Sequence, residues 1–178
     1  MPNNLNYSRF PDIFVTVMIR KAKISDVKSI HTLVNSYAEQ DLMLPRSLNN
    51  LYDNIRDFYV LEQDGKVKGC VALNIVWDDL AEVKALAVDG SVKGQGWGRK
   101  LVEECLREAK ELGIKKVFAL TLIKDFFHKL GFKTIQKRRL PQKIWGECIH
   151  CIKFPDECNE IAVMYEFNGE ASHGPSAK

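Results

Sequence analysis

The sequence contains no long hydrophobic run. The apolar stretch nearest the N-terminus covers only residues 13–19, directly after Pro11 and Asp12, and no small-residue cleavage site follows it. A helix that crosses a membrane needs about 20 apolar residues, and a secretory signal ends in a cleavage site of that kind. The sequence therefore predicts neither a membrane segment nor export.

Cysteine content and net charge are both low. Five cysteines are an odd number, and without a secretory signal they indicate reduced thiols and a cytoplasmic protein. A net charge of +3 gives no argument for nucleic acid as a partner, although it does not oppose an anionic ligand. With 178 residues, of which 46% are hydrophobic and 28% charged, the chain predicts one globular domain with a sizeable core.

A complete metal site is also missing. Cys148 and Cys151 have the spacing of half a structural zinc site, but no second half-site accompanies them. His150 lies between these two cysteines, where it is poorly placed to bind the same ion, and Cys158 stands alone. We therefore expect no metal, and the thiols are either free in a loop or joined in a reversible disulfide.

The segment 82–112 is the most informative part of the sequence. A short apolar run of strand character ends at Asp89 and Gly90, and an amphipathic helical pattern starts after a glycine-rich loop at residues 93–98. Glycine lets the main chain approach an anion closely, and the first N–H groups of a helix point toward it. Strand, glycine loop and helix in this order predict a phosphate-binding loop.

Two common phosphate-binding motifs are excluded by the spacing. A P-loop needs Gly-Lys-Ser/Thr at the helix start, and the chain has Gly98, Arg99 and Lys100. A dinucleotide fingerprint needs a third glycine where Arg99 stands. The loop is therefore expected to bind a phosphate-containing ligand of another kind. The alternative is an ordinary glycine-rich turn before a helix.

The loop sequence Lys-Gly-Gln-Gly-Trp-Gly at residues 93–98 resembles motif A of the GNAT superfamily of N-acetyltransferases. That motif reads Arg/Gln-x-x-Gly-x-Gly/Ala, and its loop holds the pyrophosphate of acetyl-CoA; Lys93 departs from the usual Arg or Gln. Residues 127–132, Phe-His-Lys-Leu-Gly-Phe, resemble motif B, Tyr-x-x-x-Gly-Phe. The resemblance runs from about Met18 to Phe167. It implies the α/β GNAT fold, with a mixed, mostly antiparallel central sheet and helices on both faces.

The order of elements along the chain agrees with this resemblance. We expect an N-terminal extension at 1–17, an acetyltransferase domain at 18–168 with a cysteine-containing loop at 141–158, and a flexible tail at 169–178. The expected strands lie at residues 15–21, 58–62, 67–77, 82–88, 116–122, 132–136 and 161–167. The expected helices lie at residues 27–38, 48–55, 99–112 and 125–130.

Three segments resemble amino-acid acetyltransferases more closely. Residues 42–47 look like their substrate loop, 82–88 like their central strand, and 140–145 like the C-terminal loop of short, stand-alone N-acetylglutamate synthase-like proteins. The resemblance implies a small-molecule amino-acid substrate, L-glutamate or a relative such as glutamine, and a role in arginine biosynthesis. Another amine as acceptor (a protein N-terminus, a polyamine) and a non-catalytic sensor of acetyl-CoA or an amino acid are the alternatives. A homodimer is among the assemblies that the sequence allows.

Glu82 is the candidate catalytic base. Acetyl transfer needs a neutral amine, whereas an α-amino group is mostly protonated near pH 7, so a base must take the proton directly or through water. Period-two alternation predicts that Glu82, Lys84, Leu86 and Val88 share one strand face. On that face Lys84 would favour the ionised carboxylate and make it a weaker base, unless Lys84 faces the substrate carboxylate instead. The alternative for Glu82 is a solvated carboxylate at a strand start.

Arg46 is the candidate for binding a substrate carboxylate, because its planar guanidinium matches two oxygens. A surface arginine without function is the alternative. Ser47 could add a hydroxyl contact or cap the following helix. Lys143 is implied as a substrate contact by the resemblance alone.

The resemblance also implies the residues that bind acetyl-CoA. Main-chain groups of Leu86, Ala87 and Val88 would pair with the pantetheine arm, and an N–H on this strand would face the developing oxyanion. Phe127 stands where many relatives have a tyrosine that protonates the leaving thiolate. Another group or water must do this, or the thiolate leaves unprotonated; His128 is more simply a solvated helix residue. The loop residues expected to hold the pyrophosphate are Lys93, Gly94, Gln95, Gly96, Trp97, Gly98 and Arg99, with core packing as the alternative for Trp97.

Overall fold

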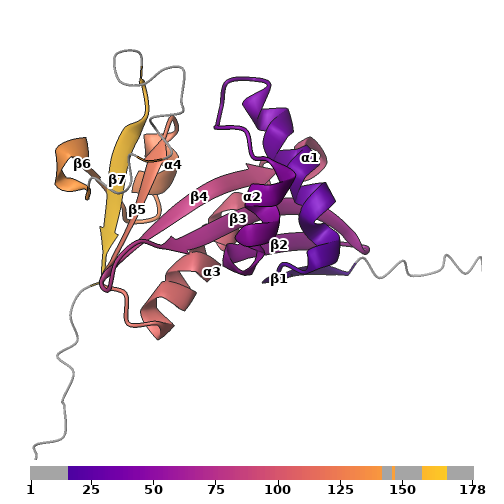
Figure 1. Ribbon diagram of the computed structural model, residues 1–178, viewed down its shortest axis with the longest axis horizontal. Coiled ribbons are helices and arrows are strands. Elements are labelled where there is room, and N and C mark those ends of the chain that lie inside the picture. Colours follow the sequence, from indigo (N-terminus) through magenta and orange to yellow (C-terminus); the bar gives the residue numbers. More distant parts are fainter. Residues whose placement is uncertain (1–15, 142–145, 147–157, 168–178) are drawn as a thin grey trace, which may run out of the picture.

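Seven strands form one mixed sheet in the order β1-β2-β3-β4-β5-β7-β6 (Figure 1). The computed structural model describes residues 16–141, 146 and 158–167. Within them, β4 and β5 are parallel, and every other strand pair is antiparallel. The strands are β1 (Val17–Lys21), β2 (Phe58–Gln63), β3 (Lys66–Ile75), β4 (Leu80–Val88), β5 (Lys116–Thr121), β6 (Lys133–Ile135) and β7 (Ile161–Glu166). The sheet confirms the predicted mixed, mostly antiparallel architecture.

Helices cover both faces of this sheet, as predicted (Figure 1). The buried residues of α1 and α2 form a core with one face, and those of α3 and α4 form a second core with the other. The apolar stripe of α3 places Leu101, Cys105 and Ala109 in that second core, fully shielded from solvent. The α-helices are α1 (Val27–Ala38), α2 (Leu48–Asp53), α3 (Trp97–Glu111) and α4 (Lys124–His128). The 3₁₀ helices are η1 (Ile24–Asp26), η2 (Ile55–Asp57), η3 (Gly90–Val92) and η4 (Lys137–Arg139).

A β-bulge interrupts β4 at Ala85. Lys84 stands opposite Ala72 of β3, whereas Ala87 stands opposite Cys70, so two residues of β4 face one residue of β3. The φ of Ala85 is 53°, in the left-handed region that alanine rarely adopts. The bulge therefore reverses which side chains of β4 face which helix layer.

The prediction that Glu82, Lys84, Leu86 and Val88 share one face is wrong for this reason. Leu86 and Val88 pack against the core beneath α3. Lys84 lies on the same face as its partner Ala72, which belongs to the core beneath α1. Glu82 precedes the bulge together with Lys84, so both carry their side chains toward the α1 layer.

Strands β4 and β5 pair over only a short distance. Residues 80–82 pair with residues 116–118, and beyond them the two strands diverge (Figure 1). In the described part of the chain, the edge of β4 that faces β5 has no strand partner from residue 83 onward. Main-chain groups of this edge therefore have no partner from β5, and a ligand placed between the two strands would face them.

Some predicted features lie outside the described residues. These are almost all of the extension at 1–17, the tail at 169–178 and most of the cysteine-containing loop at 141–158. Among the residues that the structure does describe, no helix is both long and apolar enough to cross a membrane.

Candidate functional site

The glycine loop leads from the end of β4 into α3 and leaves open space around its main chain. Gly94 has a φ of +81° and Gly96 a φ of +82°, conformations that favour glycine. A Cβ atom built on either residue would meet no atom within 4 Å. The loop therefore has both the backbone shape and the free space that close approach of a ligand requires.

The first turn of α3 offers main-chain donors beside this loop. Lys100 donates its N–H to the carbonyl of Gly96 over 3.2 Å, which is the first main-chain bond at this end of the helix. By helix geometry, the N–H groups of Trp97, Gly98 and Arg99 have no acceptor inside α3. These groups, together with the positive end of the helix dipole, form a site suited to a phosphate.

Side chains near the loop mostly bond to the protein itself. The Arg99 Nε donates to Glu103 Oε1 over 3.0 Å, and the Trp97 Nε1 donates to Gln95 Oε1 over 3.3 Å. The Lys100 Nζ lies 4.2 Å from the centre of the Trp97 ring. Trp97 also packs against the core beneath α3, as its packing alternative predicts. Anion binding at this loop would therefore rest chiefly on main-chain N–H groups.

Phe127 lies in the core and is only 4% exposed. Its ring meets those of Phe126 and Phe132 edge to face, with 5.1 Å between centroids in each case. The ring near the helix start is Phe126, because a Cβ atom on Gly98 would lie 3.6 Å from its Cζ. Phe126 was not singled out by the sequence. The contact predicted between Phe127 and the cofactor stays a prediction.

Glu82 and Lys84 lie where β4 and β5 begin to diverge. Both side chains are only 15% exposed, and the Lys84 Nζ lies 4.0 Å from Glu82 Oε2. Asn74 stands directly opposite Glu82 on β3, and its Nδ2 donates to Asp57 Oδ2 over 3.1 Å. Such low exposure argues against a solvated carboxylate as the explanation of Glu82.

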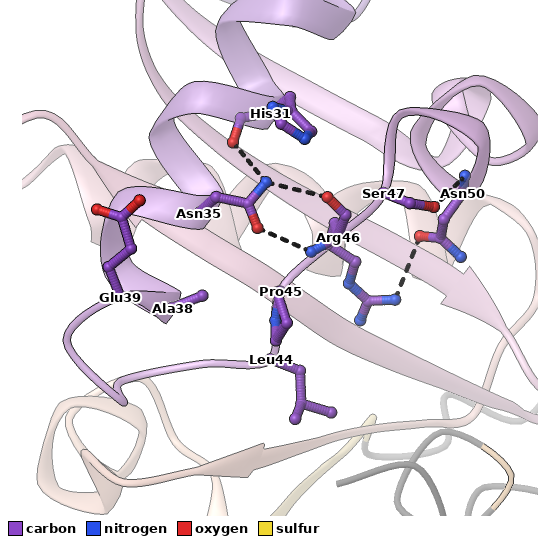
Figure 2. A pocket seen from close by; sticks show the side chains of 9 residues that line it. All are labelled: His31, Asn35, Ala38, Glu39, Leu44, Pro45, Arg46, Ser47 and Asn50. Carbon is purple, nitrogen blue, oxygen red and sulfur yellow. Dashed lines mark hydrogen bonds between the residues drawn. The ribbon is translucent and has the colours of Figure 1, made fainter.

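A cavity of about 870 Å³ lies between α1 and the segment that leads into α2. Figure 2 shows Arg46 on this segment, facing Asn35 of α1 and Asn50 of α2. Ser47 caps α2 by accepting the N–H of Asn50 over 3.2 Å, as the cap alternative predicts. Arg46 and Ser47 line this cavity, whereas Glu82 does not.

Two hydroxyl groups, one bonded to β4 and one at the end of β5, were not singled out by the sequence. Tyr37 of α1 donates its hydroxyl to the carbonyl of Val88 over 2.7 Å. Thr121, the last residue of β5, is 8% exposed, and its Oγ1 accepts the N–H of Ile123 over 3.0 Å. Both make bonds to main-chain groups, which leave no signal in a sequence.

Of the described cysteines, Cys70 contacts the bulge of β4, where its Sγ donates to the carbonyl of Ala85 over 3.5 Å. Cys70 and Cys105 are buried, and burial raises the pKa of the Cys70 thiol to about 12. Cys158 accepts a hydrogen bond from Lys137 Nζ over 3.2 Å. Across residues 16–141 and 158–167, no three His, Cys, Asp or Glu side chains gather in a way that could hold a metal ion. Cys148, His150, Cys151 and Lys143 lie outside the described residues.

Comparison with known sequences gives one family. The family model described as "Acetyltransferase (GNAT) family" matches residues 24–132. An uncharacterized N-acetyltransferase of Chlorobaculum tepidum is 40% identical over 146 residues, which cover 82% of this chain and 94% of that protein. The amino-acid acetyltransferase of Mycobacterium tuberculosis is 36% identical over 133 residues, covering 73% and 76% respectively. The amino-acid acetyltransferase of Neisseria meningitidis is 33% identical, but the match covers only 32% of its length.

Solved structures agree with the sequence comparison. N-acetylglutamate synthase from Neisseria gonorrhoeae, complexed with coenzyme A and N-acetyl-glutamate, has a TM-score of 0.78 at 28% identity. The match covers 86% of this chain and 36% of that one, so this chain spans about a third of the Neisseria enzyme. A Mycobacterium tuberculosis protein in complex with CoA and a second ligand has a TM-score of 0.75 at 30% identity, with 85% and 99% covered.

Proposed function

Because the chain belongs to the GNAT family of acetyltransferases, we propose that it transfers the acetyl group of acetyl-CoA to the α-amino group of an amino acid. We take L-glutamate as the preferred acceptor and arginine biosynthesis as the role. Support for an amino-acid acceptor comes from the names of two relatives, each called an amino-acid acetyltransferase. Support for glutamate comes from the N-acetylglutamate synthase among the structural neighbours.

The observation that carries the proposal is the open edge of β4, which runs directly into the glycine loop. GNAT enzymes use acetyl-CoA, which supplies the acetyl group as an activated thioester. The residues present fit this cofactor, because a Cβ on Gly94 or Gly96 would enter free space and the first turn of α3 has spare donors. The loop and that turn would hold the pyrophosphate, and main-chain groups of residues 86–88 would hold the pantetheine arm.

Glu82 is assigned the role of base. The acceptor enters as an ammonium and must lose a proton before its nitrogen can attack. Glu82 accepts this proton directly or through one water. Its position beside the fork of β4 and β5 supports this, because the same fork opens the edge along which the thioester would lie.

Arg46 and Lys84 are assigned to the acceptor's carboxylates. A glutamate has two carboxylates, and two cations on separate elements could take one each. The Lys84 ammonium is beside Glu82 at 4.0 Å, so a carboxylate bound there would lie next to the base. Arg46, on the segment between α1 and α2, would bind the other carboxylate, with Ser47 serving as a helix cap.

Thr121 is assigned the role of proton donor to the leaving thiolate. Phe127 has no hydroxyl and lies in the core. Thr121 ends β5, the strand on the other side of the gap from the open edge of β4. Its oxygen accepts the Ile123 N–H, and its hydroxyl proton would pass to the thiolate while water returns a proton to this oxygen, so that no alkoxide is left behind.

The test is release of free thiol from acetyl-CoA with a panel of amines. Glutamate, glutamine, a polyamine and a peptide N-terminus are compared at equal concentration, with acetyl-CoA alone as the blank. Turnover that is fastest with glutamate supports the proposal. Turnover only with a polyamine or a peptide would show that the acceptor is wrong. Binding of coenzyme A without turnover on any amine would indicate a sensor.

A further inference from the structure

Arg46 is held by its main chain as well as by its side chain. Pro45 precedes it, and proline fixes its own φ; Ser47 follows it as the N-cap of α2. The guanidinium Nη1 donates to Asn50 Oδ1 over 3.4 Å. The segment that carries Arg46 thus leads into α2, and α1 faces it across the cavity (Figure 2).

Asn35 on α1 bonds both main-chain groups of Arg46. Its Oδ1 accepts the N–H of Arg46 over 3.0 Å, and its Nδ2 donates to the carbonyl of Arg46 over 3.0 Å. The same Nδ2 also donates to the carbonyl of His31, one turn earlier on α1, over 3.0 Å. Both donor hydrogens and the acceptor oxygen of this side chain are therefore engaged.

We propose that Asn35 is a positioning residue for the acceptor site, which fixes Arg46 so that its guanidinium is in place before an acceptor carboxylate arrives. This rests on the function proposed above, because it takes Arg46 as a carboxylate ligand. Two bonds to the N–H and C=O of one residue fix both its location and the orientation of its main chain. Free rotation of this segment is then lost during folding rather than during acceptor binding.

Asparagine is the side chain that this role demands. Aspartate could accept the Arg46 N–H but would set a carboxylate against the carbonyls of Arg46 and His31. Alanine would lose all three bonds. The amide acts on the main chain of Arg46, so it does not compete with the acceptor for the guanidinium.

The experiment is a double-mutant cycle on Asn35 and Arg46, measured as KM for glutamate, KM for acetyl-CoA and kcat. Asn35→Ala should raise the KM for glutamate about tenfold and change the other two constants less than about twofold. In an Arg46→Ala background, Asn35→Ala should raise the KM for glutamate no further, because Asn35 acts on this constant through Arg46. Ser36→Ala is the matched control, because the Ser36 hydroxyl donates to the carbonyl of Leu33 within α1, and this variant should leave all three constants unchanged.

Each outcome of the cycle decides the proposal. Equal effects of Asn35→Ala in both backgrounds, or equal rises in both KM values, would show a merely structural role and overturn it. A wild-type protein that acetylates no amino acid would refute the proposed function, and with it the role of Asn35. If Asn35→Ala does not fold, Asn35→Asp serves instead and should also raise the KM for glutamate alone.

Discussion

At the scale of single residues, Glu82 is surrounded by residues of three strands. Asn74 of β3 and Phe118 of β5 stand beside it in the sheet, and Lys84 follows it on β4. A carboxylate with 15% exposure beside an ammonium at 4.0 Å is positioned rather than solvated. Such a group can receive a proton from a ligand at the fork without a change in the fold.

Replacing Glu82 tests its role as base. Glu82→Gln keeps the shape but cannot accept the proton, so kcat should fall about a hundredfold or more. The KM for acetyl-CoA should stay the same, because no loop residue is changed. Steady-state kinetics measure both constants. Glu111→Gln is the control, since Glu111 is 61% exposed at the C-terminal end of α3; a normal kcat in Glu82→Gln would remove Glu82 from the mechanism.

Replacing Thr121 tests the proton donor. Thr121→Val removes the hydroxyl and should lower kcat about tenfold, a modest effect because a thiol has a pKa near 8.5 and its thiolate leaves readily. Thr121→Ser keeps a hydroxyl on β5 and should restore most of the rate. Stopped-flow release of thiol measures both variants. An equally slow Thr121→Ser would mean that packing, rather than the hydroxyl, is what matters.

The site residues differ in how far the sequence could reveal them. Glu82, Arg46 and the loop glycines were proposed from residue type, spacing and the family resemblance. Asn35 and Thr121 were not proposed, because their partners are main-chain groups far along the chain or in a turn. A sequence shows which side chains exist but not which carbonyl or N–H each one meets.

At the scale of elements, β4 shows where a sequence pattern fails. Period two holds up to Lys84 and again after Leu86, but the bulge at Ala85 shifts the phase between the two halves. Alanine at a φ of 53° is an unusual choice, so residue type gave no warning. The bulge explains how one strand can direct Glu82 toward α1 and Leu86 toward α3.

The glycine loop gives the next prediction. Gly94→Ala should raise the KM for acetyl-CoA about tenfold, because a left-handed φ costs a residue with a Cβ about 1–2 kcal/mol and the loop would shift to avoid it. Gly65→Ala is the matched control. Gly65 also has a positive φ, +74°, and open space for a Cβ, but lies in the turn between β2 and β3. Urea unfolding should show a similar loss in the free energy of unfolding for both variants. A similar KM for acetyl-CoA in both would contradict a role of the loop at Gly94 in binding.

The stability that the start of α1 contributes to the fold should depend on pH. Asp26 accepts two bonds from the Arg20 guanidinium, at 2.6 and 3.1 Å, and one from the N–H of Lys23 at 2.7 Å. The hydrogen bonds from Arg20 lower the pKa of the Asp26 carboxyl below its usual value. A lowered pKa in the folded state contributes stability above the unfolded value, near 3.9, and this is lost as pH falls through the folded pKa.

Asp26→Asn should therefore destabilise the protein by about 2 kcal/mol near pH 7. The difference from wild type should shrink as the pH falls below about 4, because the carboxyl of the unfolded wild-type chain takes up a proton there, whereas that of the folded protein does so only at a lower pH. Urea unfolding at several pH values measures both quantities. Asp125→Asn, at a side chain that is 84% exposed, should change neither, and a pH-independent difference for Asp26→Asn would refute the account.

At the scale of the whole molecule, most of the fold could be predicted from the sequence. The strands and helices follow from periodicity and glycine stops, and the predicted ends lie within a few residues of those observed, as for α2, which ends at Asp53 rather than at residue 55. What could not be predicted is how far neighbouring strands stay together. The parting of β4 and β5 after residue 82 leaves no mark in the periodicity of either strand, and this parting opens the edge on which the proposed function rests.

The most direct test of the central claim is a competition among acceptors. The protein is given limiting acetyl-CoA and an equimolar mixture of the standard amino acids, and the acetylated products are separated by mass. N-acetylglutamate should exceed every other product, and Glu82→Gln protein should form almost none of it. A mixture without any N-acetyl amino acid, or one dominated by a product other than N-acetylglutamate, would contradict the proposed activity or its proposed acceptor.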